Sequence, residues 1–375
     1  MKIAIIEANF TGLNHAYPNG IYTEIFRKLS DNEHVDLFCS GYHYENLSVE
    51  KSKIVFHPLR VLLPGKMRIL KFFLEYFQSI NIITKTDADL YVFLSAFPNV
   101  QFFLTKYLTR NKNKKVILFT HGEMEGLISK GKWKIWSYPF WVTLCSKIKM
   151  PSNLYRIVLG EGILENMKRF KKFSNIYSIE QPRDGFMDKN EIRPTMHNNK
   201  FAFIGNCLYK KGGETIIRAA ESIEQNSESS ISIIGAYDLK LNNIPKKIKL
   251  LSTPHQLLRK DDFENALSSI AYACFPYPSN TYKFTASGAV LDAIRWLKPI
   301  IYIHNDYFDA IFKDAGDIGY ACADESAFID TIIRIDESPD NERYKKQIDN
   351  LRKLQNKFKI DTVTESIAKI VFEAK

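Results

Sequence analysis

Short apolar runs alternate with amphipathic stretches along this chain, and the alternation occurs twice. In the first half, the runs with the length of a buried strand are Ile3–Ile6, Val35–Cys39, Leu90–Leu94, Val116–Thr120 and Arg156–Leu159. Stretches with helical spacing lie between them, at Ile21–Leu29, Met67–Ile80, Val100–Thr109 and Lys132–Cys145. Such alternation favours a parallel sheet with helices on both faces. The first half therefore predicts a doubly wound α/β domain.

The pattern begins again after residues 184–200, a polar segment with little periodicity that predicts a linker. The expected strands of the second half are Phe201–Ile204, Ser230–Ile234, Ala271–Phe275 and Ile300–Ile303, and the expected helices are Thr215–Ser222 and Gly288–Trp296. A length of 375 residues suits two domains of roughly 150–200 residues each. We therefore expect an α/β protein of two doubly wound, Rossmann-like domains, residues 1–185 and 195–357, that face a cleft.

The end of the chain, about residues 358–375, predicts one more helix. One side of it carries Val363, Ile367, Ile370 and Val371. In a two-domain architecture, a final helix of this kind can pack back onto the first domain, and we expect that arrangement here.

Positive charge is concentrated in the first half. Residues 1–185 contain 26 Lys and Arg but only 16 Asp and Glu, which accounts for the whole net charge of +10. Basic and aromatic residues are interleaved at Lys66–Phe73, Lys130–Trp141 and Lys168–Lys172. This composition suits an anionic membrane surface, while core packing of the aromatic residues between solvated lysines explains the Trp133–Trp141 stretch equally well. Nucleic-acid binding is disfavoured, because the second half is neutral and contains no known module.

Several classes of protein are excluded or disfavoured by what the sequence lacks. The five cysteines are odd in number, widely spaced and without a CxxC pair, so they predict reduced thiols and no zinc site or disulfide framework. The Ile3–Ile6 run is too short for a signal peptide, and no apolar stretch reaches the roughly 20 residues of a spanning helix. No GxGxxG follows Ile3–Ile6, which disfavours a nicotinamide dehydrogenase.

Two segments of the second half are candidate anion-binding sites at helix N-termini. The first follows the strand that ends at Gly205 and contains Asn206, Lys210, Lys211 and the pair Gly212–Gly213. Backbone N–H groups at such a helix start can bind a phosphate and the lysines can add charge, but a glycine-rich turn with solvated lysines fits as well. The second contains Thr285, Ser287 and Gly288 before a helix. Asp292, one turn later, is placed either to bind ribose hydroxyls or to sit exposed on a capped core helix.

The order and spacing of these segments resemble the donor domain of GT-B glycosyltransferases of the family 4-like group, also called glycosyltransferase group 1. The likeness rests on Gly205 followed by Lys211–Gly212, on Pro276, and on the run from Asp292 to Ile300. The resemblance implies that Lys211 contacts the donor diphosphate, that the Ser287–Gly288 loop faces the phosphates and sugar, and that Asp292 holds the ribose. The chain departs from the family pattern in having Phe284 in place of the first glutamate of E-x7-E, Asn206 in place of an arginine, and Leu297 in place of a glycine.

In the first half, the run Val116–Thr120 leads directly into a polar turn with His121, Glu123 and Glu125. By the same resemblance, His121 contacts the transferred sugar near the reacting carbon. Glu123 or Glu125 then orients His121, holds an acceptor hydroxyl or acts as a base; a structural histidine capped by a glutamate is the alternative. After the first strand, Gly12 resembles the glycine loop near the diphosphate. His15 is either an acceptor contact or a loop histidine without a role in the site, and the second interpretation is favoured.

The sequence therefore predicts a glycosyltransferase that moves a hexose-type residue from a nucleotide-diphosphate sugar to a glycan acceptor, expected to be lipid-linked, in cell-surface polysaccharide synthesis such as capsule or O-antigen. The resemblance implies a retaining reaction without a bound metal or other cofactor, on the cytoplasmic face of the plasma membrane. An inverting GT-B transferase and a nucleotide-sugar epimerase of the same fold remain alternatives. A non-catalytic nucleotide-sugar-binding protein, suggested by Phe284, is the alternative from another class.

Overall fold

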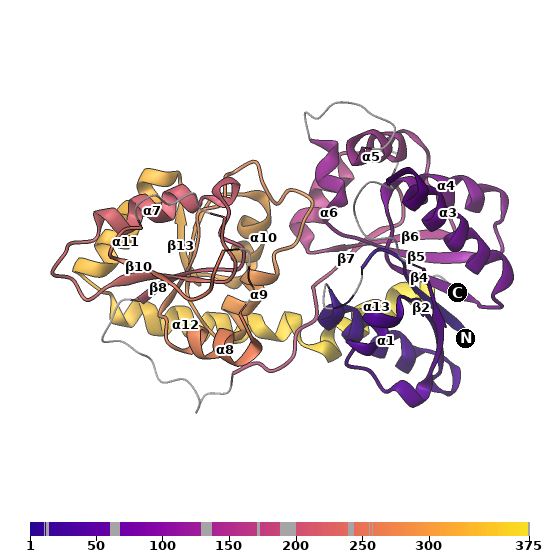
Figure 1. Cartoon of the computed structure of the whole chain (residues 1–375), viewed down its shortest axis with the longest axis horizontal. Coiled ribbons are helices and arrows are strands. Elements are labelled where there is room, and N and C mark those ends of the chain that lie inside the picture. The colour runs from indigo at the N-terminus through magenta and orange to yellow at the C-terminus, as the bar shows by residue number, and fades with distance from the viewer. Residues whose placement is uncertain are drawn as a thin grey trace. The chain divides into compact units, whose positions relative to one another are not determined.

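The computed structural model describes residues 1–10, 12, 15–60, 68–128, 137–170, 173–187, 200–238, 244–254, 256 and 258–373. The chain divides into two compact units (Figure 1). Unit 1 consists of Met1–Pro182, Phe284–Ala286 and Ile360–Lys375, and unit 2 consists of Arg183–Lys283 and Ser287–Lys359. Neither unit is a single continuous stretch of chain.

Unit 1 contains a seven-stranded sheet in the order β3-β2-β1-β4-β5-β6-β7. Its strands are β1 (Ile3–Glu7), β2 (Val35–Cys39), β3 (Ile54–Pro58), β4 (Leu90–Ser95), β5 (Lys115–Thr120), β6 (Leu154–Leu159) and β7 (Ile176–Ile179). Every neighbouring pair is parallel. Parallel neighbours need crossover connections, and helices supply them.

Helices cover both faces of this sheet (Figure 1). They are α1 (Ala16–Leu29), α2 (Gly41–Glu45), α3 (Arg68–Lys85), α4 (Pro98–Arg110), α5 (Tyr138–Lys147), α6 (Glu161–Lys168) and α13 (Ile360–Glu373), with short 3-10 helices at Asp31–Glu33, Lys51–Lys53 and Gly122–Leu127. Helices α1 and α13 bury apolar side chains in one core with alternate residues of β1, β2 and β4, whereas α3 and α4 build a second core on the other face. The sheet is therefore apolar on both sides, as parallel sheets require.

Unit 2 contains a six-stranded parallel sheet in the order β10-β9-β8-β11-β12-β13. Its strands are β8 (Lys200–Ile204), β9 (Ser230–Ile234), β10 (Ile248–Leu250), β11 (Tyr272–Phe275), β12 (Ile300–Ile303) and β13 (Gly319–Cys322). Its helices are α7 (Gly213–Ser222), α8 (Lys260–Ser268), α9 (Gly288–Arg295), α10 (Asp306–Ala315), α11 (Glu325–Glu337) and α12 (Asn341–Gln355), with 3-10 turns at Tyr209–Lys211 and Asn356–Phe358. Helix α7 packs against α11, and α9 packs against α12 (Figure 1).

The predicted fold class is confirmed, and all nine predicted strands are present. The strands that the sequence failed to predict are β3, β7, β10 and β13, which are the four edge strands of the two sheets. The burial of β3 and β10 is interrupted by exposed side chains, and no described residue of β7 except Ile179 is fully buried. An edge strand is covered on one side only, so it lacks the continuous apolar run that marks a central strand.

The structure describes the aromatic stretch near α5 from Ser137 onward. The helix predicted over Lys132–Cys145 begins at Tyr138, and residues 129–136 lie outside the described part of the chain. Trp141 is 7% exposed and packs with Phe102 and Cys145, so this tryptophan belongs to the core. All five cysteines of the chain are buried and unpaired.

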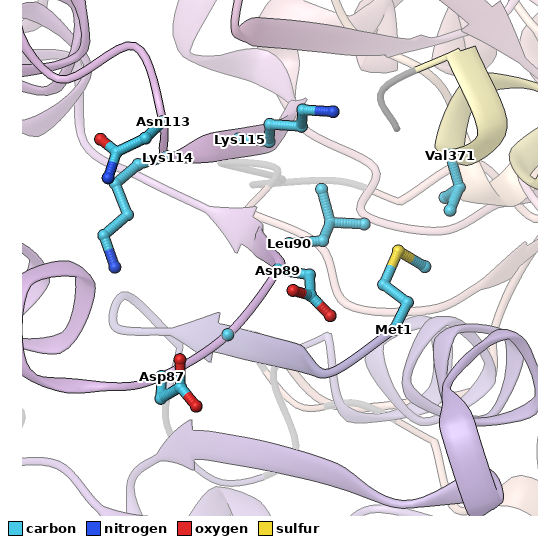
Figure 2. A pocket seen from close by; sticks show the side chains of 9 residues that line it. Met1, Asp87, Asp89, Leu90, Asn113, Lys114, Lys115 and Val371 are labelled. Atoms are coloured by element: carbon cyan, nitrogen blue, oxygen red, sulfur yellow. The ribbon is translucent and has the colours of Figure 1, made fainter.

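A pocket of about 600 Å³ opens at the amino ends of two central strands of unit 1 (Figure 2). Its wall is formed by residues before and within the starts of β4 and β5, by the first residue of the chain, and by one residue of α13: Met1, Asp87–Leu90, Asn113–Lys115 and Val371. This edge of the sheet is opposite the carboxyl ends, where ligands of doubly wound sheets bind.

In the described part of the chain, no helix is long and apolar enough to cross a membrane.

Helix α13 should contribute strongly to the stability of unit 1. Ile367 is fully buried in the core that α13 shares with α1 and the sheet, whereas Phe372 on the same helix is 59% exposed. Replacing Ile367 with Ala should lower the free energy of unfolding by about 2–5 kcal/mol, because it removes buried methyl groups and leaves a cavity. Phe372→Ala should change it by less than about 0.5 kcal/mol. Chemical denaturation of both variants measures this, and equal effects would contradict the assignment of α13 to the core.

Candidate functional site

Each sheet has one point where the strand order reverses, and ligands of doubly wound folds bind there, outside the carboxyl ends of the strands. In unit 1 this point lies between β1 and β4, and in unit 2 between β8 and β11. The residues that follow these strands are therefore the first candidates for a site. Each unit is described separately below.

In unit 1, a buried carboxylate stands at the point of reversal. Glu7 ends β1 and is 1% exposed, and its Oε1 accepts hydrogen bonds from Ser95 at the end of β4 and from the backbone N–H groups of Asn9 (2.8 Å) and Phe10 (3.0 Å). Burial raises the pKa of the Glu7 carboxyl, and these hydrogen bonds oppose that rise. Glu7 therefore fixes the first turn of the loop after β1.

The same carboxylate reaches the glycine loop through two buried side chains. Asn19 Nδ2 donates to Glu7 Oε2 and lies 3.1 Å from His43 Nε2, while His43 Nδ1 lies 2.9 Å from the carbonyl oxygen of Gly12. A carbonyl only accepts, so His43 Nδ1 carries the proton and Nε2 accepts from Asn19. The predicted residue Gly12 has a φ of 61°, and its carbonyl oxygen accepts a hydrogen bond from His43. Sequence reasoning singled out neither His43 nor Asn19.

His121 directly follows β5, and its ring orientation is fixed. Its Nε2 lies 2.7 Å from the carbonyl oxygen of Leu94 on β4. Because that oxygen can only accept, Nε2 carries the proton of the neutral imidazole, and Nδ1 is left with its lone pair. His121 therefore presents a hydrogen-bond acceptor of the kind that a hydroxyl group can bind.

Glu123 is held by donors on both of its carboxylate oxygens. Oε2 accepts from the backbone N–H of His121 (2.9 Å), and Oε1 accepts from Gln101 Nε2 on α4 (2.9 Å). This arrangement fixes the turn that carries His121. Glu123 thereby contacts the backbone of His121, the residue whose Nδ1 keeps its lone pair.

His15 and Phe10 adjoin His121. Phe10 stacks on His15 with ring centroids 4.0 Å apart, and the centroids of His15 and His121 are 5.5 Å apart. Desolvation in this cluster, with the neighbouring His121, lowers the pKa of His15 to about 4, although the residue keeps an exposed edge. His15 is consequently neutral at pH 7, and the structure brings the predicted residues His15, His121 and Glu123 together with Phe10.

The Glu125 carboxylate is hydrogen-bonded to other residues of unit 1. Its Oε1 accepts from the backbone N–H of Phe284 (2.8 Å) and from the hydroxyl of Thr285 (3.2 Å). Phe284–Ala286 belong to unit 1, with Phe284 4% exposed and Ala286 packed on the core beneath α1. Thr285, predicted to face the donor, thus lies beside Glu125, predicted to bind the acceptor.

In unit 2, the turn after β8 brings Lys211 over two aromatic rings. Lys211 Nζ lies 5.8 Å from the ring centroid of Tyr277 and 5.5 Å from that of Tyr282, and these two rings stack 4.7 Å apart. Gly212 has a φ of 82° and begins α7 with its Cα against the backbone of Pro276 after β11. Asn206 and Lys210, by contrast, are exposed. The aromatic rings orient the Lys211 ammonium at the point of strand reversal.

The second predicted segment of unit 2 lies at the start of α9. Ser287 is buried in the N-cap position, and Gly288 has open space where a side chain would be. Asp292 is also buried and forms an ion pair with Arg183. Burial raises the pKa of Asp292, and the guanidinium opposes that rise. Asp292 therefore already has a cationic partner from the segment that begins unit 2.

Sequence reasoning missed Glu7, Gln101, His43, Tyr277, Tyr282 and Arg183. Glu7 is the residue with a usable sequence signal, because it is a carboxylate that ends an apolar strand run. The others lie on helices or turns distant in sequence, and only folding brings them to the site. Among the described residues, no group of three or more His, Cys, Asp and Glu side chains could hold a metal ion.

Comparison with known proteins identifies the fold. No family model and no curated protein sequence matches the chain. Among solved structures, it is similar to the Anabaena protein HepE in complex with UDP and glucose, at 12% identity and a TM-score of 0.65 over 99% of both chains. It is also similar to sucrose-phosphate synthase from Thermosynechococcus elongatus, at 14% identity and a TM-score of 0.67 over 100% of this chain and 98% of that one.

A third similar structure is WaaG, a glycosyltransferase involved in lipopolysaccharide biosynthesis, at 12% identity and a TM-score of 0.64 over 99% of both chains. These matches extend over the whole chain and both units. The chain therefore has the GT-B fold, as the sequence predicted.

Replacing either of two glycines at the helix starts of unit 2 with alanine should have different effects on the free energy of unfolding. Gly212→Ala should destabilise unit 2 by roughly 1–3 kcal/mol, because its φ is left-handed and the new Cβ would clash with the Pro276 carbonyl. Gly288→Ala should leave the free energy of unfolding within about 0.5 kcal/mol or raise it, since nothing lies within 4 Å of its Cβ position. Denaturant titration of the two variants checks this, and an equal loss in both would refute the close packing of Gly212.

Proposed function

We propose that this protein is a nucleotide-sugar-dependent glycosyltransferase. The observation that carries the proposal is the position of His121: in a GT-B fold, a histidine with its proton fixed on Nε2 presents a bare Nδ1 lone pair beside the strand reversal of unit 1. A sugar hydroxyl is a matching donor for that nitrogen. HepE has been crystallised with UDP and glucose, and WaaG is a glycosyltransferase, which supports the same class for this chain.

In this proposal, unit 2 binds the nucleotide diphosphate of the donor. The turn Lys211–Gly213 and the open start of α9 at Gly288 offer an ammonium group, backbone N–H groups and space for phosphate oxygens. These groups would stabilise the leaving diphosphate electrostatically as the glycosidic bond breaks. In this proposal, neither the binding of the diphosphate nor its departure requires a metal. Asp292 would reach a ribose only if its pairing with Arg183 opens.

The acceptor is proposed to be a glycan, lipid-linked, in cell-surface polysaccharide synthesis, and the reaction to be retaining. The lipopolysaccharide context of WaaG supports this setting by analogy of fold. His15 and Phe10, stacked beside His121, offer a flat apolar face of the kind that packs against a sugar ring.

Lys211 should be needed for nucleotide binding, and Lys210 should not. Thermal-shift titration with UDP, GDP, dTDP and CMP should give a rise in melting temperature with one nucleotide, since a ligand of the native state stabilises it by mass action. Lys211→Ala should abolish that rise and Lys210→Ala, an exposed neighbour, should keep it.

Turnover separates the alternatives. Release of the nucleotide from its sugar conjugate only when a glycan acceptor is present indicates a transferase. Turnover of the donor without acceptor indicates an epimerase, and binding without turnover indicates a non-catalytic protein. No shift with any nucleotide in the wild type would contradict the proposed donor site.

We also propose that unit 1 docks on the anionic inner face of the plasma membrane through α3. Leu70, Phe73 and Phe77 follow one another at helical spacing and are 50%, 49% and 63% exposed. Amphipathic helices with exposed apolar side chains bind the membrane interface when basic residues accompany them, and unit 1 carries the positive charge of the chain. Lys66, at the start of the predicted basic segment, lies outside the described residues, whereas Lys168 pairs with Glu165.

Co-sedimentation with phosphatidylglycerol vesicles tests the role of α3. The wild type should sediment with them and not with neutral phosphatidylcholine vesicles, because the attraction is partly electrostatic. The double variant Phe73→Ser with Phe77→Ser should lose most of this binding. Phe372→Ser, which removes an equally exposed aromatic from α13, serves as the control and should bind like the wild type. Equal loss in control and double variant would argue against docking through α3.

A further inference from the structure

Arg156 is a buried cation without a carboxylate partner among the described residues. It lies on β6, is 1% exposed, and none of the described carboxylates forms an ion pair with it. Its Nη1 donates to Gln101 Oε1 (2.9 Å) and to the hydroxyl of Thr120 (2.8 Å), its guanidinium lies 5.1 Å from the ring centroid of Phe173, and its Nε has no hydrogen-bond partner among the described residues. Burying a guanidinium without a carboxylate costs free energy, so Arg156 is a candidate for a functional role that would offset this cost.

Gln101 connects this cation to the proposed active site. The side chain is fully buried on α4, and its two ends face opposite partners: Oε1 accepts from Arg156, while Nε2 donates to Glu123 Oε1 (2.9 Å) and to the backbone carbonyl of Ala96 (2.7 Å). An amide with its oxygen on a cation and its nitrogen on an anion is polarised in one direction along the whole chain of contacts.

The chain of contacts ends at His121. Glu123 uses its other oxygen to hold the backbone N–H of His121 (2.9 Å), and Thr120, which also touches Arg156, precedes His121 at the end of β5. Burial decreases along this path, from fully buried Arg156 and Gln101 to half-buried Glu123 and His121. The residue proposed to contact a ligand, His121, therefore lies at the more exposed end of this path.

We propose that Arg156 and Gln101 are positioning residues of the active site, which fix Glu123 and through it the backbone of His121. The positive charge of Arg156 balances the carboxylate of Glu123 across the Gln101 amide. Glu123 is thereby held with its Oε2 aimed at the His121 N–H. This inference rests on the proposed glycosyltransferase function for its kinetic consequence, but not for its structural one.

The kinetic test compares kcat and KM for the nucleotide sugar. Gln101→Met keeps the approximate shape of the side chain and removes its three hydrogen bonds, so kcat should fall about 10–100-fold through misplacement of His121, while donor KM stays within about twofold. Arg156→Lys keeps the charge and should retain more turnover than Arg156→Met. The matched control is Arg27→Met: Arg27 is similarly buried but pairs with Glu24, Glu33 and Glu50 away from the site, so its loss should lower the melting temperature and leave kcat within about twofold.

A second measurement does not depend on activity. In protein labelled with ¹⁵N-histidine, the backbone amide signal of His121 should move in Gln101→Met and in Glu123→Gln in the same direction, and should stay in place in Arg27→Met. An unmoved His121 amide, or a folded Gln101→Met with kcat within twofold of wild type, would overturn the positioning role. Absence of turnover in the wild type would instead refute the proposed function, and the amide signal would still decide the positioning role.

Discussion

The structure depends on one constraint: the central strands of two parallel sheets must be apolar on both faces. Side chains of β1, β4 and β5 point alternately into the two cores of unit 1, so helices have to cover both sides. In β1, β4 and β5, the polar groups of the site therefore appear where the strands end. Glu7, Ser95 and Thr120 are the last residues of β1, β4 and β5, and each is engaged in the hydrogen bonding of the site.

At these strand ends, the charged side chains of unit 1 are stabilised by hydrogen bonds more than by direct ion pairs. Glu7 is stabilised by a hydroxyl, two backbone amides and the Asn19 amide, and Glu123 by Gln101 and a backbone amide. Such bonds have defined directions, whereas an exposed ion pair has little geometric preference. The result is a site whose carboxylates have fixed hydrogen-bond partners, and in which no described residue hydrogen-bonds to Nδ1 of His121. Of the roles that the sequence leaves open for Glu123 and Glu125, these hydrogen bonds favour a positioning role.

Unit 1 is completed by segments that come late in the chain. Helix α13 supplies Val363 and Ile367 to the core beneath α1, and Phe284–Ala286 are held by Glu125. The position where the resembled family has a glutamate is occupied by Phe284, whose backbone N–H is bound by the Glu125 carboxylate. A carboxylate is thus present beside this position, although it comes from a distant part of the sequence.

The sequence by itself determined the central strands, several of the helices that cover them (α1, α3, α4, α5, α7, α9 and α13) and the strand ends where chemistry is expected. These features follow from local periodicity, which burial on one or both faces imposes directly on the order of residues. The edge strands, the pairing of Asp292 with Arg183, and the path from Arg156 through Gln101 to Glu123 were decided only by tertiary structure. The edge strands are short and carry exposed or half-buried side chains, so they lack the continuous apolar run of a central strand. A hydrogen bond between residues 55 positions apart, such as that of Arg156 with Gln101, depends on which strands and helices become neighbours.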